Sequence, residues 1–246
     1  MDRSVYVAMT GATQIMRAQD AVSHNLANAS TVGFKSELSA FQSIPVLGDG
    51  SPSRINAVAQ GIGQSGAQGS SMPTGRSLDI SVRGPGWIAV QSPDGAEGYT
   101  RAGDLQLTAD GQLTDSRGNA VMGSSGPITI SPSTNISIGA DGTISTVPLG
   151  QGPNSVSTLD KIRLVNPDSS QLTQGSDSLM HMADGSTAGT DPTVTLASGM
   201  LEGSNVNPSA ELVKMIALSR QYDMQVKSIK ASEDNADSAI KLLQSS

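Results

Sequence analysis

The sequence predicts an α+β protein in which a mainly antiparallel β domain, built of many short strands and hairpins, is flanked by long N- and C-terminal helices. At both ends of the chain, apolar residues recur every three or four positions, which is the period of a helix. The middle instead has short alternating runs separated by Asp-Gly pairs, a pattern typical of β-hairpins. The length of 246 residues is sufficient to bury a core.

Residues 1–34 are predicted to form an N-terminal helical segment that pairs with the C-terminal helix. The inward face recurs at steps of three and four: Val5, Met9, Ala12, Met16, Gln19, Val22 and Leu26. The pattern stops at residues 28–33, where Gly33 can adopt the positive φ that ends a helix.

Residues 35–77 are predicted to be a Gly/Ser/Pro-rich extension. Residues 43–77 contain ten Gly and Pro, and residues 60–71 are almost entirely Gly, Gln, Ser and Ala. Such a segment is loose by itself. We therefore expect its order to come from a partner.

Residues 78–200 are predicted to form the β-rich central domain. Leu78 to Val82 alternates apolar and polar residues, and residues 105–107, 128–130 and 136–138 repeat this pattern. Asp-Gly pairs begin at Asp94, Asp110, Asp141 and Asp184, and we expect them to form turns. The single tryptophan, Trp87, is interpreted as a core residue.

Residues 201–246 are predicted to form a C-terminal coiled-coil helix that begins near Pro208. Its expected seam has an average spacing of 3.5 residues: Leu212, Met215 or Ile216, Ser219, Tyr222, Val226, Ile229, Glu233, Ala236, Ile240 and Leu243. Polar and small residues weaken this seam, so a helix pair within one chain would be marginal. We expect the chain ends to pack against neighbouring subunits as well.

Composition and charge exclude several classes of function. The net charge is −7, and all of it lies in residues 41–204, which hold seven basic and fourteen acidic residues. With no basic stripe, nucleic-acid binding is not expected. There is no Cys and there are only two His, which argues against disulfides and zinc sites. No apolar run is long enough to span a membrane, and the first residues do not resemble a cleavable secretory signal.

Two short motifs suggest chemistry that their surroundings do not support. Residues 61–66 fit G-x-G-x-x-G, but the strand and helix that dinucleotide binding requires are not predicted around them. Residues 238–241 fit S-x-x-K without the companion motifs of a serine acyl-enzyme. We therefore predict no catalytic residues, no cofactor, no metal and no enzymatic activity.

Three segments resemble the bacterial flagellar rod and hook proteins. Residues 23–35, SHNLANASTVGFK, are similar to the N-terminal signature of that family, with His24 in the place of an Asn. In the middle, residues 78–82, 86–87, 99–103 and 110–113 resemble the shared β region. Residues 201–206, LEGSNV, and the following helix resemble the closing motif. The opening residues, the run 41–46 and the modest length are more like the proximal-rod type than the distal-rod type.

The resemblance implies a structural subunit of the flagellar basal-body rod that polymerises into the helical drive shaft joining motor to hook. It implies export by the flagellar type III apparatus, a periplasmic location, and partners that are copies of itself and the inner-rod and distal-rod proteins. Alternatives are a distal-rod protein and, in other classes, a ligand-binding β module with oligomerising helices or a hydrolase using carboxylates of the middle region.

The residues that we expect at assembly interfaces come from the two helical faces and the two terminal motifs. They are Val5, Met9, Ala12, Met16, Val22, Asn25, Leu26, Asn28, Thr31, Gly33, Phe34, Leu201, Glu202, Ser204, Asn205, Val206, Leu212, Met215, Ile216, Tyr222, Val226, Ile229, Ile240 and Leu243.

Overall fold

The computed structural model describes residues 3–45, 55–150, 155–175 and 177–244. The described chain divides into two compact units. The first unit draws on residues 1–29, 37–62 and 206–246, and the second on residues 30–36 and 63–205. Helices at the two ends and antiparallel strands in the middle confirm the predicted α+β class.

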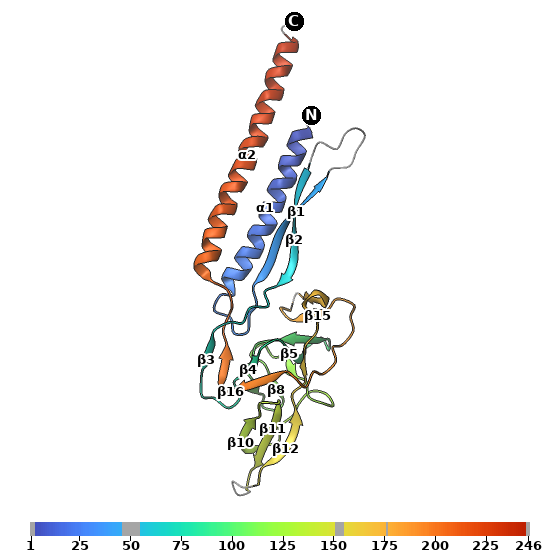
Figure 1. Cartoon of the computed structure of the whole chain (residues 1–246), viewed down its shortest axis with the longest axis vertical. Helices are drawn as coiled ribbons and strands as arrows, with labels where there is room; N and C mark the ends of the chain where they lie inside the picture. The colour runs from blue at the N-terminus through green and yellow to red at the C-terminus, as the bar shows by residue number, and fades with distance from the viewer. Residues whose placement is uncertain (1–2, 46–54, 151–154, 176, 245–246) are drawn as a thin grey trace. The chain divides into compact units, whose positions relative to one another are not determined.

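The first unit is a pair of helices accompanied by a two-stranded ribbon. Helix α1 (Arg3–Ala27) lies alongside helix α2 (Pro208–Gln244), and strands β1 (Glu37–Pro45) and β2 (Ile55–Gln64) lie beside α1 (Figure 1). The helices meet through a small apolar cluster of Ile15, Ala18, Val22, Leu218, Met215 and Tyr222. Helix α1 lies within the predicted segment 1–34, and α2 begins at Pro208, near which the sequence predicts its start.

Local signals explain where α2 begins. Asn207 precedes the helix, and its Oδ1 accepts hydrogen bonds from the backbone N–H of Ser209 (3.1 Å) and Ala210 (3.2 Å). Pro208 occupies the first helical position, where a missing N–H loses no bond. This N-cap satisfies donors that the first turn would otherwise leave unpaired.

The second unit consists of short strands joined by tight turns. Its strands are β3 (Ser71–Pro73), β4 (Ile80–Arg83), β5 (Trp87–Gln91), β6 (Glu97–Thr100), β7 (Gln106–Leu107), β8 (Leu113–Thr114), β9 (Ala120–Val121), β10 (Ser133–Ile138), β11 (Thr143–Pro148), β12 (Ser157–Lys161), β13 (Leu164–Val165), β14 (Leu172–Gln174), β15 (Met180–Met182), β16 (Thr195–Ser198) and β17 (Met200–Glu202), with a 3-10 turn at Ser169–Gln171.

The largest sheet in the described part of this unit has the order β14-β15-β6-β5-β9-β8-β7, with β13 also paired to β5. Strands β10, β11 and β12 form a smaller sheet, and β4 pairs with β16 and β3 with β17. Three of the predicted Asp-Gly turns connect neighbouring antiparallel strands, with φ of +85° at Gly95, +81° at Gly111 and +87° at Gly142. Glycine tolerates this left-handed backbone, which explains why the turn pattern is predictive.

The described residues of the second unit form two apolar clusters. The larger includes Ile80, Ile88 and Leu113, which are fully buried. The other forms around Tyr99 and Val165, and Trp87 packs against it while remaining half-buried. Trp87, which we expected in the core, therefore lies at the margin of the core. The Arg101 guanidinium lies 5.5 Å from the centroid of its ring.

The structure corrects one expectation about the extension. Within residues 43–77, the described residues form the end of β1 and all of β2 and β3. We had expected this segment to be loose without a partner. Order comes from within the chain, because β1 pairs with β2 and the side chain of Gln14 in α1 accepts a hydrogen bond from the Ala59 N–H at 3.0 Å. Because backbone hydrogen bonds do not require a regular spacing of apolar residues, the sequence pattern does not indicate this pairing. Residues 46–54 lie outside the described part.

Candidate assembly surface

The helix pair of the first unit exposes large apolar side chains on its outer faces. On α1, Tyr6 is 60% exposed and Met9 and Met16 are each 52% exposed. Exposed apolar residues on α2 include Leu212, Val213, Ile216, Met224, Val226 and Ile240. Apolar surface gathered on one element of a soluble protein usually marks an interaction site.

The inward face of each helix differs in part from the one predicted. Ala12 and Val22 are buried and Met215 and Tyr222 are half-buried, as expected of a seam, whereas Met9, Met16, Leu212, Ile216, Val226 and Ile240 are exposed. Ile15, Ala18 and Leu218 supply the missing contacts. The side chain of Leu243 lies outside the described residues. Ala8, Ala12 and Ala18 are among the buried residues of α1, and each of these small side chains contributes little apolar area.

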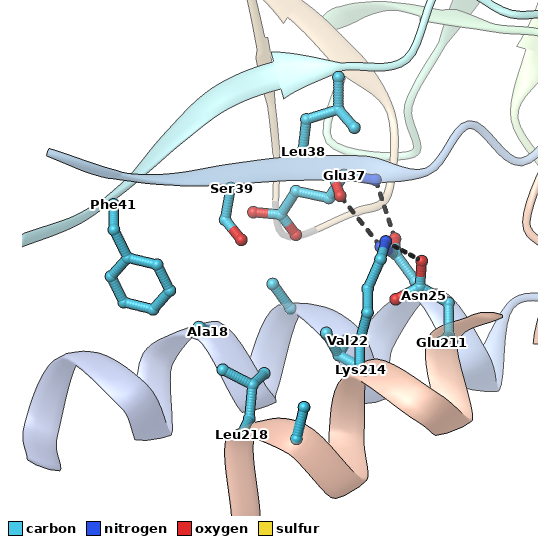
Figure 2. Close-up of a pocket in the computed structure, with 12 residues that line it drawn as sticks. Ala18, Val22, Asn25, Glu37, Leu38, Ser39, Phe41, Glu211, Lys214 and Leu218 are labelled. Atoms are coloured by element: carbon cyan, nitrogen blue, oxygen red, sulfur yellow. Dashed lines mark hydrogen bonds and ion pairs between the residues drawn. The ribbon is translucent and has the colours of Figure 1, made fainter. Parts of the chain in front are cut away.

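Asn25, a predicted site residue, joins α1 to the start of β1. Its side chain donates to the Glu37 carbonyl at 3.0 Å and accepts from the Glu37 N–H at 2.8 Å (Figure 2). The amide thus copies the pairing of a neighbouring strand at the point where β1 begins. Asn28 bonds locally instead, with its Nδ2 donating to the His24 carbonyl at 3.0 Å. Val5 and Leu26 are half-buried.

A buried ionic cluster lies in the second unit. Glu202 is 2% exposed, and its carboxylate accepts from Lys35 Nζ at 2.6 Å and from Arg101 Nη1 at 3.0 Å. The Gly69 N–H also donates to it at 3.0 Å. Lys35 and Arg101 are themselves buried, so the cluster holds two cations around one carboxylate.

The charges of the cluster also hold nearby backbone. Lys35 Nζ donates to the Ala67 carbonyl and Arg101 Nη2 donates to the Gly84 carbonyl, both at 2.7 Å. These bonds spread the excess positive charge over carbonyl dipoles. Buried charges of this kind are tolerated when every partner is present, and the loss of one partner is strongly destabilising.

Burial alone would raise the pKa of Glu202. The hydrogen bonds from Lys35 and Gly69, together with the charges of both cations, outweigh burial and hold this pKa below its usual range. Burial lowers the pKa of Lys35, and the hydrogen bond to Glu202 opposes that shift only in part. The carboxylate therefore stays ionised and attracts both cations.

Backbone bonds bring the two terminal motifs together around the cluster. The Gly33 N–H donates to the Glu202 carbonyl at 2.7 Å, and the Asn205 N–H donates to the Phe34 carbonyl at 3.3 Å. Asn205 also accepts from the Ser36 N–H at 2.7 Å through its side chain and donates to the Ala67 carbonyl at 2.9 Å.

Several predicted interface residues are thus packed inside the second unit. Phe34 and Glu202 are buried, and Thr31, Gly33, Leu201, Ser204 and Asn205 are half-buried. Val206 is also buried and belongs to the first unit. Lys35 and Arg101 were not among the expected site residues. The one signal in the sequence that could have suggested them is that each of the three segments resembling the rod and hook proteins contains a charged residue.

The described residues contain no group of three or more His, Cys, Asp or Glu placed to hold a metal ion. The G-x-G-x-x-G run begins inside β2 and leads into residues without regular structure. Within the same described ranges, no helix combines the length and apolar character needed to cross a membrane.

A helix pair with exposed apolar faces, joined to a separate β unit, is typical of a structural subunit that assembles through its helices. Family models match three segments of the chain: "Flagella basal body rod protein" at residues 5–35, "Flagellar hook protein FlgE/F/G D1 domain" at 81–146, and "Flagellar basal body rod FlgEFG protein C-terminal" at 197–242.

Curated relatives align over almost the whole chain. The chain is 40% identical to flagellar basal-body rod protein FlgF of Escherichia coli and 38% identical to FlgF of Salmonella typhimurium, in each case over 99% of both proteins. It is 34% identical to FlgG of Buchnera aphidicola subsp. Schizaphis graminum over 94% of this chain and 95% of that protein. The chain belongs to the flagellar basal-body rod protein family. It is a FlgF-like structural subunit of the flagellar basal body.

Proposed function

We propose that the chain forms part of the proximal rod, polymerising with copies of itself and with other rod proteins into the helical shaft that carries torque from motor to hook. The observation that carries this proposal is the exposed apolar surface on both helices, with Met9 and Met16 on α1 and Ile216 and Met224 on α2. Neighbouring subunits that cover these side chains would gain the hydrophobic stabilisation that one chain cannot supply.

The proximal position, rather than the distal one, is supported by similarity. Identity to the FlgF protein of Escherichia coli is 40% over 99% of the chain, against 34% over 94% for a FlgG protein. The distal position is the second candidate because the two kinds of rod protein share these motifs. The role is mechanical and involves no catalysis. We further propose export through the flagellar type III apparatus and assembly in the periplasm, as for a rod that crosses that space.

The test uses the source bacterium with the gene for this chain deleted and then restored as wild type, Ile216→Asp or Leu149→Asp. Ile216 is exposed on α2, and Leu149 is a comparably exposed apolar residue of the second unit. We expect wild type and Leu149→Asp to restore complete rods that contain the chain, and Ile216→Asp to lower its amount in purified basal bodies at least tenfold. Basal bodies that are complete without the chain would refute the proposal.

A further inference from the structure

The first unit contains a groove that its own side chains leave unfilled. The groove has a volume of about 260 Å³ and lies between α1, β1 and the beginning of α2 (Figure 2). Ala18, Ala21 and Ala217 line its helical walls, and Phe41 projects from β1 toward the helices. Small side chains on the walls leave room for an apolar side chain from outside.

One wall of the groove also carries a buried carboxylate. Glu211, in the first turn of α2, is 5% exposed. Its Oε1 accepts from Lys214 Nζ at 2.7 Å, while its Oε2 has no hydrogen-bond partner among the described residues. A buried acceptor without a partner is unfavourable, so a cation brought into the groove would stabilise this wall.

The matching chemistry lies at two adjacent exposed positions of α1. Met16 is 52% exposed, and methionine is a flexible side chain that fills irregular apolar gaps. Arg17 follows it, is exposed, and takes part in no ion pair that the described residues form. Together they offer an apolar side chain for the unfilled space and a second cation for Glu211, whose Oε2 is not bonded by Lys214.

Met16 cannot fill the groove of its own chain. Met16 and the groove residue Ala18 are two positions apart on α1, which places them roughly 200° apart around the helix. Met16 and the groove are therefore on opposite sides of one helix. A contact between them joins different patches of two subunits, and such heterologous contacts add copies in an open series.

We propose that the groove between α1, β1 and α2 receives Met16 and Arg17 of a second copy of this chain. The inference rests on the proposed rod function and specifies one of its subunit contacts. Met16 packs against Ala18, Ala217 and Phe41 of the receiving copy. Arg17 approaches the unpaired oxygen of Glu211.

Photocross-linking in assembled rods tests which molecule occupies the groove. A benzophenone amino acid replaces Met16 in the full-length chain, and cross-linked peptides are mapped by mass spectrometry. We expect a product of two copies of this chain, joined from position 16 to residues 38–41 or to the segment around Ala217. A cross-link from position 16 to a different rod protein would overturn the second-copy proposal while leaving the proposed function in place.

Groove filling provides an independent measurement. Ala217→Phe blocks the groove, whereas Ala210→Phe adds the same side chain at an exposed position of α2 outside it. We expect Ala217→Phe to lower the amount of the chain in basal bodies at least tenfold relative to Ala210→Phe. Equal incorporation of the two variants would overturn the proposal, provided that wild-type rods contain the chain.

The ionic part is tested by suppression. Arg17→Glu places a second carboxylate against Glu211, and we expect at least a fivefold loss of incorporation. Glu211→Gln removes that repulsion without changing the size of the side chain, so Arg17→Glu/Glu211→Gln should recover most of the loss. If the double variant is no better than Arg17→Glu, Arg17 does not reach Glu211.

Discussion

At the scale of single residues, Gly33 shows how the terminal motifs depend on backbone geometry. Its φ is +69°, and a Cβ built there would lie 2.3 Å from backbone atoms of Arg101 and Ala102. We expect Gly33→Ala to destabilise the second unit by about 2–3 kcal/mol, from left-handed strain and the clash together. Urea denaturation followed by Trp87 fluorescence measures the change.

Gly75 is the matched control for this substitution. Its φ of +72° is nearly the same, but a Cβ there would meet no atom within 4 Å. Gly75→Ala should therefore show the conformational effect alone, about 1 kcal/mol. Equal losses of stability in the two variants would mean that the close approach to Arg101 adds nothing to the destabilisation.

Glu202 gives a second prediction at the scale of one residue. Because its pKa in the folded chain lies below the ordinary value of 4.5, the unfolded chain binds the proton more readily, and stability must fall as the pH drops below about 4.5. Glu202→Gln should cost about 3–5 kcal/mol at pH 7, since it leaves two buried cations without their carboxylate. The variant should also lose this part of the acid dependence.

The measurement is the urea midpoint of the second unit between pH 3 and pH 7. Asp94→Asn is the control, because Asp94 is exposed in a turn and Asn-Gly supports the same turn type. We expect the control to change stability at pH 7 by less than about 0.5 kcal/mol. A Glu202→Gln chain as stable as this control would show that the cluster contributes nothing.

At the scale of elements, the helix pair depends on a narrow seam. Leu218 is 9% exposed and packs with Ile15, Ala18 and Val22, whereas Ile216 on the same helix is 56% exposed. We expect Leu218→Ala to destabilise the pair by about 2–3 kcal/mol, and Ile216→Ala to change it by less than about 0.5 kcal/mol. Hydrogen exchange of α1 amides in the free subunit distinguishes the two. The opposite ranking would contradict the seam.

The sequence predicts these elements better than the faces they bury. Steps of three and four locate α1 and α2, and Asp-Gly pairs locate turns at Gly95, Gly111 and Gly142. Met215 and Tyr222 pack in the seam as predicted, but Leu218 packs where Ser219 was expected. When a helix has apolar residues on more than one side, several different faces fit the same three- and four-residue spacing. Periodicity alone does not say which face packs against the other helix of the chain and which face remains exposed.

The ionic cluster was beyond prediction for a different reason. Glu202 is 167 positions from Lys35 and 101 from Arg101 along the chain. A single sequence contains many possible pairs of opposite charge, and only the folded path of the backbone selects among them. The terminal motifs indicated that Gly33 and Glu202 matter, but the contact between them depends on strand pairing across the whole second unit.

At the scale of the whole molecule, the two units differ in how much core each holds. Among the described residues, the first unit has one small apolar cluster around Ile15 and Leu218, while the second has two larger ones. Local opening requires less free energy where fewer apolar contacts are lost. We therefore expect the helices of a dilute free subunit to open first, although the strands are shorter elements.

Limited proteolysis of the free subunit by thermolysin, read by mass spectrometry, tests this order. We expect early cleavage within α1 and α2 and a resistant fragment close to residues 63–205, which form most of the second unit. The same protease applied to purified basal bodies is the control, and there the helices should resist because neighbouring subunits cover them. Helices that survive in the free subunit while the strands are cut would contradict an assembly in which the chain ends gain their stability from neighbours.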